Sequence, residues 1–219
     1  QLESTCFWRA RSEGSVAWLS VTDTFDIGVP AMGVYMAATT PPVFETPDPH
    51  LRAPEGDVVP QARWNESAGL DLIQLWQKEE RPPAPVCVLM GLRPQEVAEG
   101  TVTMSMPASL WFCTGFGTFY GGALTAFADA AINSAVMTTL PAGASFGTLD
   151  LKVNFLRPVT PDGRDLVARA TVEQRGRTIA VSTCRIDDAD GKRVAMATGS
   201  AMISPDRPWP TGTSSGSPA

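Results

Sequence analysis

One segment limits the possible folds more than any other: residues 121–140 form a predicted helix that is apolar on nearly every side. The segment is rich in alanine, lacks proline and glycine after its first two residues, and stops at Leu140-Pro141-Ala142-Gly143. A helix that is hydrophobic almost all round is a buried helix. The rest of the domain must therefore wrap around it.

Segments in which apolar and polar residues alternate lie on both sides of this helix, and alternation predicts strands. Turn signals such as Asp187–Gly191 separate the later segments, as in an antiparallel meander. The sequence therefore predicts an α+β fold, with a long central helix wrapped by one antiparallel sheet. The predicted strands are Glu96–Pro107, Thr148–Arg157, Arg164–Glu173, Thr178–Ile186 and Arg193–Ile203.

We assign one complete domain to residues 67–204. An amphipathic helix at Ser67–Arg81, stopped by two prolines, begins it. Residues 41–66 are rich in proline and charge and are predicted to be a linker. The last residues, 205–219, have the composition of a disordered tail.

Residues 1–40 contain an internal echo of the later domain. Gly14–Gly33 resembles Gly176–Ala197 when one gap is allowed, since both contain a strand, an acidic glycine turn and a strand starting Ala-Met. One interpretation is that residues 1–40 hold the closing hairpin of an earlier, similar unit. The other is that any two β-hairpins look alike, and the sequence leaves both open.

Composition excludes several classes of function. The net charge of −6 argues against nucleic acid as a main partner, because binding phosphates needs a basic face. No apolar run approaches the roughly 20 residues of a membrane span, so no membrane association is expected. The cysteines are irregularly spaced, which predicts reduced thiols in a cytoplasmic protein and no metal site.

The chain has a single histidine, His50, in a proline-rich stretch. A Ser-His-Asp or Cys-His site would depend on this one poorly placed residue. A hydrolase with this sequence would therefore work with a carboxylate and water, without a metal or redox cofactor.

Two features of the central helix suggest where chemistry takes place. Gly121 and Gly122 begin the helix, where unpaired N–H groups and the positive end of the macrodipole could form an oxyanion hole. Glycines also simply begin helices, so this segment alone is weak evidence. Asp129 stands in the middle of the apolar helix, and burying an unpaired carboxylate is costly. The alternative is a narrow solvated stripe of Thr125, Asp129 and Asn133.

The order and spacing of these residues resemble a known family. Gly117–Asp129, with Tyr120-Gly121-Gly122 at its centre, is similar to the His-Gly-Gly…Asp signature of hotdog-fold, PaaI-like acyl-CoA thioesterases. Thr148–Pro158 resembles the strand that follows in that family, and Gly176-Arg177 and the hairpin at Asp190 also fit. The resemblance covers roughly residues 86–204.

The resemblance implies hydrolysis of acyl-CoA by a homodimer, a homotetramer or a tandem pair of hotdog units. In the family the glycine at Gly121 polarises the thioester carbonyl, the aspartate at Asp129 acts as base or nucleophile, and a hydroxyl residue at Thr148 helps to hold the attacking water. Catalytic candidates are thus Asp129, Gly121, Gly122, Tyr120 and Thr148. Substrate-binding candidates are Thr114, Asn133, Arg157, Arg175 and Arg177, the arginines as possible contacts for the CoA phosphates.

The chain departs from the family pattern twice. Tyr120 replaces the histidine, and Thr114 stands where the family often has Asn or Asp. These departures keep a second hypothesis open, a hotdog module that binds an acyl group or acyl-CoA without catalysis and supports a partner unit. A hotdog hydratase or dehydratase is disfavoured because the sites of those enzymes resemble an Asp/His pair, and this chain has no suitably placed histidine.

Helix geometry adds an argument of its own. Asp129 follows Gly121 by eight residues, which is about 12 Å along a helix. A base must act within hydrogen-bond reach, directly or through one water. One helix cannot place both groups on the same carbonyl, so the sequence predicts a composite site between two hotdog units.

Overall fold

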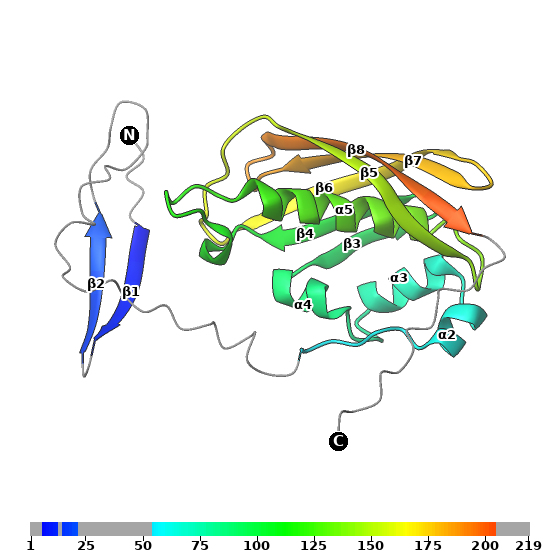
Figure 1. Cartoon of the computed structure of the whole chain (residues 1–219), viewed down its shortest axis with the longest axis horizontal. Coiled ribbons are helices and arrows are strands. Elements are labelled where there is room, and N and C mark those ends of the chain that lie inside the picture. Colours follow the sequence, from blue (N-terminus) through cyan, green and yellow to red (C-terminus); the bar gives the residue numbers. More distant parts are fainter. Residues whose placement is uncertain (1–5, 13–14, 22–53, 205–219) are drawn as a thin grey trace, which may run out of the picture.

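A computed structural model describes residues 6–12, 15–21 and 54–204 of the chain (Figure 1). Within residues 54–204 a long helix, α5 (Gly121–Met137), lies against one face of a six-stranded antiparallel sheet. The fold class is α+β, and the helix wrapped by a sheet has the hotdog architecture that the sequence predicts.

The order of strands across the sheet differs from their order along the chain. The order is β3-β4-β6-β7-β8-β5, and every neighbouring pair is antiparallel. The strand β5 follows α5 directly but pairs with β8, so it forms one edge of the sheet. The strands are β3 (Arg93–Ala98), β4 (Thr101–Pro107), β5 (Ser145–Phe155), β6 (Asp165–Arg175), β7 (Ile179–Asp187) and β8 (Arg193–Ser204).

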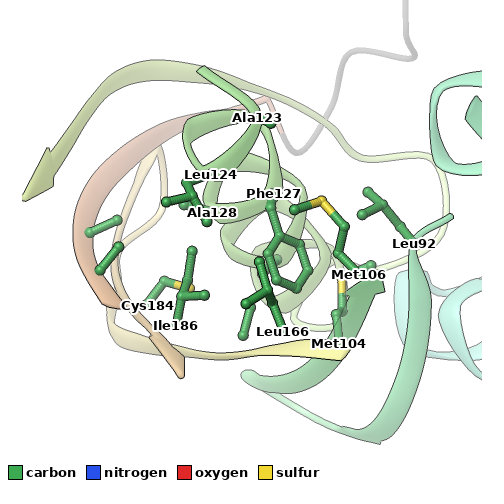
Figure 2. Close-up of a cluster of buried hydrophobic side chains, with 14 of the residues drawn as sticks. Leu92, Met104, Met106, Ala123, Leu124, Phe127, Ala128, Leu166, Cys184 and Ile186 are labelled. Atoms are coloured by element: carbon green, nitrogen blue, oxygen red, sulfur yellow. The ribbon is translucent and has the colours of Figure 1, made fainter. Parts of the chain in front are cut away.

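The main core forms where α5 meets the sheet. Figure 2 shows Phe127 of α5 reaching among side chains of the strands, and its side chain is fully buried. Every strand from β4 to β8 contacts α5. Fully burying one side chain of this kind is worth about 1.5–3 kcal/mol relative to leaving it exposed, so this contact is a major source of stability. Labelled neighbours of Phe127 in the cluster are Leu92, Met104, Met106 and Leu166.

The prediction of a single strand at Glu96–Pro107 is wrong, because a turn divides this segment between β3 and β4. Gly100 has a φ of +74°, a left-handed conformation that glycine adopts without strain, and the chain reverses there between β3 and β4. The Gly100 N–H donates to Thr138 Oγ1 at 2.8 Å, which ties this turn to the end of α5.

Two threonines, Thr138 and Thr139, follow the end of α5, which comes three residues before the predicted stop at Leu140. The hydroxyl of Thr138 donates to the carbonyl of Ala135, and that of Thr139 to the carbonyl of Val136, each at 2.7 Å. Hydroxyls that bond back to the preceding turn compete with the backbone ladder of a helix. The helix therefore gives way to a turn at this point.

Three short helices precede the sheet, α2 (Gln61–Glu66), α3 (Gly69–Gln77) and α4 (Pro85–Met90). The helix predicted at Ser67–Arg81 is present as the shorter α3, whereas α4 was not predicted. α2 occupies the last residues of the segment 41–66 that the sequence assigns to a linker. α3 packs beside β3 and against the end of α5.

Gly69 lets α3 begin directly against the end of α5. Its N–H donates to the carbonyl of Leu140 at 3.0 Å. A β-carbon built on Gly69 would lie 1.9 Å from the carbonyl oxygen of Met137, a distance that no side chain can occupy. This glycine is therefore required by a close backbone approach.

At the other end of the chain, β1 (Cys6–Ser12) and β2 (Ser15–Val21) form an antiparallel hairpin in a two-stranded sheet of their own. The second strand of the echo, beginning at Ala31, and the predicted tail at residues 205–219 lie outside the described residues.

We expect Gly69→Ala to destabilise the fold by about 1–3 kcal/mol, because the methyl group forces α3 away from α5. Urea unfolding should show a lower midpoint. Gly147→Ala is the matched control, since a β-carbon there meets no atom within 4 Å. Equal midpoints for the two variants would contradict the close approach.

Candidate functional site

The sheet leaves one stripe of α5 uncovered. Gly122 and Ala126 are exposed, and Asp129 and Asn133 are half-buried. These residues are three or four positions apart and share one face of the helix. The sequence offered a solvated stripe of Thr125, Asp129 and Asn133 as the alternative to a buried charge. All three residues are half-buried, so Asp129 is not fully buried within a single chain.

The loop before α5 is closed by its own hydrogen bonds. Thr114 N donates to Thr118 O at 2.7 Å, and the two threonine hydroxyls lie 2.8 Å apart. The Tyr120 N–H donates to the carbonyl of Phe112 at 2.7 Å, which fixes the residue directly before the helix. The Thr114 side chain, predicted to bind substrate, is engaged in closing this turn.

The first two residues of α5 are glycines because aromatic rings lie against both. A β-carbon on Gly122 would lie 2.2 Å from Cε1 of Tyr120, and one on Gly121 would lie 3.1 Å from Cζ of Phe155. The Tyr120 side chain makes no capping hydrogen bond, so it leaves the first N–H groups of the helix unused. Among the described residues, the N–H groups of Gly121 and Gly122 have no hydrogen-bond acceptor. They remain available to a ligand oxygen, as the oxyanion-hole prediction requires.

A hollow of about 420 Å³ opens beside Gly121. Its walls are mostly apolar, and the charged side chain in its lining is Arg157, whose Nη1 donates to the carbonyl of Arg193 at 2.6 Å. We call it the Gly121 hollow. It is lined by Phe119, Gly121, Leu124, Phe155, Leu156, Arg157, Pro158 and Val159.

Asp129 and Thr148 meet two turns further along α5. The hydroxyl of Thr148, on β5, donates to Oδ1 of Asp129 at 3.0 Å. Nδ2 of Asn133 donates to the same hydroxyl at 2.9 Å. The structure thus brings together three residues that the sequence singled out from two separate segments.

A β-bulge aims Thr148 at the helix. Thr148 pairs with Ala201 and Asp150 with Ser200, so Leu149 has no partner in β8. Such an extra residue re-aims neighbouring side chains. Strict alternation along this strand would put Leu149 and Phe155 on one apolar face with Leu151 and Val153, but Leu149 is 53% and Phe155 54% exposed. The alternation gave no signal for the bulge or for the contact of Phe155 with Gly121.

The three candidate arginines separate into two places. Arg157 lines the Gly121 hollow. Arg175 is the last residue of β6 and lies in the same cross-strand row as Thr148, through Ala180 and Ala201, whereas Arg177 is in the following β6–β7 turn. Arg157 is therefore at the Gly121 end of α5, and Arg175 is in the row that contains Thr148.

Gly121 and Asp129 remain apart within one chain. They lie on the same helix, about 12 Å from each other along its axis. β5 runs along both, with Phe155 at Gly121 and Thr148 at Asp129. A single copy therefore does not bring the two groups to one carbonyl.

The described part of the chain can also be inspected for reactive thiols, metal-ligand groups and membrane-spanning helices. Burial raises the pKa of the Cys87 thiol to about 11 and that of Cys184 to about 12, so neither is a thiolate near neutral pH. Residues 54–204 and the β1–β2 hairpin contain no group of three His, Cys, Asp or Glu side chains arranged for a metal ion. No helix within these residues has the length and apolar character needed to cross a bilayer. His50 lies outside them.

The chain is similar to solved thioesterase structures. A phenylacetic acid degradation-related thioesterase from Ralstonia eutropha is 32% identical, with a TM-score of 0.55 over 59% of this chain and 98% of that one. A thioesterase from Haemophilus influenzae is 25% identical, with a TM-score of 0.54 over 64% and 94%. A variant of the phenylacetic acid degradation protein PaaI from Thermus thermophilus is 27% identical, with a TM-score of 0.50 over 54% and 98%.

No curated protein matches the sequence. The model of the thioesterase superfamily matches residues 116–195, a range that contains Gly121, Asp129 and Thr148. The chain therefore belongs to the thioesterase superfamily, whose hotdog fold is formed here by α5 and its six-stranded sheet.

Proposed function

We propose that the chain hydrolyses acyl-CoA thioesters to a free acid and CoA, at a site composed of Asp129 from one hotdog unit and Gly121 from another. The observation that supports this most directly is the uncovered stripe of α5, which presents an aspartate held by Thr148 beside an open sheet edge. Membership of a superfamily of thioester hydrolases supports the reaction type.

Asp129 is suited to activate water. Its Oδ1 accepts from Thr148, and Oδ2 accepts no hydrogen bond within residues 54–204. In the proposed step Asp129 removes a proton from water while the water oxygen attacks the thioester carbonyl carbon. The C–S bond then breaks, and CoA leaves as a thiolate that takes up a proton. In the variant in which Asp129 is the nucleophile, its carboxylate attacks the carbonyl carbon, the C–S bond breaks to release the CoA thiolate, and water then hydrolyses the acyl–Asp129 anhydride to the free acid.

The charge that develops on the carbonyl oxygen needs donors. The N–H groups of Gly121 and Gly122 supply them at the positive end of α5. The Tyr120 ring and the Phe155 ring lie beside these two glycines. No metal or redox cofactor takes part in the proposed reaction.

The Gly121 hollow and the arginines fit the two ends of an acyl-CoA. Apolar walls beside the oxyanion donors suit an acyl group or the pantetheine arm. Arg157 at this hollow, with Arg175 at the end of β6 and Arg177 on the β6–β7 turn, would contact the CoA phosphates. Thr114 would act indirectly, by keeping the loop before Tyr120 closed.

The free edge of β5 suggests how two units combine. Its outer edge pairs with no strand of the described chain, and unpaired edges are templates for another strand. Antiparallel pairing of two β5 strands around their middle would set the Phe155 end of one beside the Thr148 end of the other. Gly121 of one copy would then approach Asp129 of the second.

The partner unit is a second copy of this chain or a preceding hotdog unit. The β1–β2 pair favours the second option in one respect, because its antiparallel pairing ends at Ser12 and Ser15, on either side of Gly14 in the sequence, and the echo aligns Gly14 with Gly176 of the β6–β7 turn. It remains a prediction that residues 1–40 are the remainder of an earlier unit. It also remains a prediction that the protein acts in the cytoplasm.

The second candidate is a hotdog module that binds acyl-CoA without hydrolysing it. Two observations favour it: a tyrosine at position 120, and a Thr114 hydroxyl that is already engaged by Thr118. Release of CoA from a panel of short acyl-CoAs separates the two candidates, because the module would bind the panel without turnover.

Asp129→Asn should lower kcat by about 10²–10⁴-fold, the range of a lost general base, with the fold intact. Steady-state release of CoA measures the change, and circular dichroism checks the fold. Asp150→Asn is the matched control, because Asp150 lies two residues beyond Thr148 on β5 and accepts from Ser200. Near-full turnover in Asp129→Asn would remove this residue from the mechanism.

Tyr120→His should retain or raise activity, because the loop already has the glycines and hydrogen bonds that begin α5. Tyr120→Ala should lower activity more, since it removes the ring that packs beside Gly122. Both are compared by kcat/KM on one acyl-CoA and by thermal melting. Loss of both stability and activity in Tyr120→His would show that the tyrosine is a packing residue and would contradict the assigned role of the loop.

Mixing Asp129→Asn with Gly121→Val chains, each inactive alone, should restore activity if copies of this chain pair. A hybrid dimer carries one site with both intact groups, so an equal mixture should reach about a quarter of wild-type turnover. Light scattering establishes the assembly state of each sample. A stable monomer with full turnover would overturn the composite site. A confirmed homodimer without complementation would show that its sites are not shared in this way.

A further inference from the structure

The amide of Asn133 is directed at β5. Asn133 and Asp129 are one turn apart on α5, and both contact the hydroxyl of Thr148. Nδ2 of Asn133 lies 2.9 Å from that hydroxyl, and Oδ1 of Asn133 lies 3.3 Å from it. The same hydroxyl lies 3.0 Å from Oδ1 of Asp129.

The hydroxyl of Thr148 has one proton, so these contacts compete. If Thr148 donates to Asp129, its lone pairs accept from Nδ2 of Asn133, and all three groups are satisfied. If it donates to Oδ1 of Asn133, Asp129 loses its only donor within residues 54–204. A hydrogen bond to a charged carboxylate is the stronger one, which favours the first arrangement.

The bulge at Leu149 makes this arrangement specific to one position of β5. Thr148 stands just before the unpaired residue, and its hydroxyl reaches the helix from an edge strand. An amide at position 133, with two N–H donors, can fill the acceptor side of this hydroxyl. A carboxylate of the same shape would instead compete for its proton.

We propose that Asn133 is a positioning residue, which acts through Thr148 and not by contact with the substrate. Donation from Asn133 orients the Thr148 proton toward Oδ1 of Asp129 and leaves Oδ2 for the attacking water. The inference rests on the proposed hydrolysis for its kinetic part, and on hydrogen-bond geometry alone for its structural part.

Asn133→Asp is the decisive change, because it keeps the shape of the side chain and removes the donor. We expect kcat for acyl-CoA hydrolysis to fall by about tenfold, within the range of measured couplings between contacting residues, while KM stays within about twofold. Gln74→Glu, the same amide-to-carboxylate change on α3, serves as the control and should keep wild-type values.

A double-mutant cycle with Thr148→Val separates action through Thr148 from direct action. The variant Asn133→Asp/Thr148→Val should be no slower than Thr148→Val alone, and Thr148→Ser should keep the effect of Asn133→Asp. Losses that multiply in the double variant would overturn the proposal, since they indicate a direct charge effect. A raised KM with unchanged kcat in Asn133→Asp would overturn it too, since that is the behaviour of a substrate ligand.

Crystal structures of the wild-type protein and of Asn133→Asp test the same inference without an activity measurement. In Asn133→Asp, Thr148 Oγ1 should move beyond hydrogen-bond distance of Asp129 and toward residue 133. An unchanged Thr148–Asp129 contact would overturn the inference. Absence of CoA release from every acyl-CoA by the wild-type chain would instead refute the proposed function and leave this structural test in force.

Discussion

The structure depends on covering one helix. α5 is apolar around most of its circumference, and residues such as Phe127, Ala128 and Ala131 are fully buried. One flat sheet could cover only one side of such a helix, so the strands curve around it and β4 through β8 all reach it. The short helix α3 closes the far end of α5, and Gly69 removes the side chain that would keep the two apart.

The site lies where this cover is incomplete. The stripe from Gly122 to Asn133 is the part of α5 that its own sheet leaves exposed or half-buried, and β5, the strand beside it, is an edge. Covering the stripe fully would improve the core of one copy but would remove the aspartate and the helix N-terminus from any ligand. An uncovered stripe and an open edge on the same side also give a second hotdog unit a surface on which to pair.

Rigid elements hold each part of the site in place. The loop before α5 is tied by Thr114 and Thr118, and the aromatic rings of Tyr120 and Phe155 fit only because positions 121 and 122 are glycines. The carboxylate of Asp129 is held by a hydroxyl on a bulged strand. Flexible side chains on loops would hold these groups less well, because each would lose more conformational freedom on binding.

The amino-acid sequence was enough to predict the architecture and to single out the residues of the candidate site. An unbroken apolar helix requires burial, alternating strands supply the cover, and the spacing of Gly121 and Asp129 is fixed by the rise of the helix. It did not reveal the turn at Gly100, the bulge at Leu149 or the contact of Phe155 with Gly121. Those features depend on strand register and on residues far apart in the chain, so the meeting of Thr148 and Asn133 beside Asp129 became visible in the folded chain.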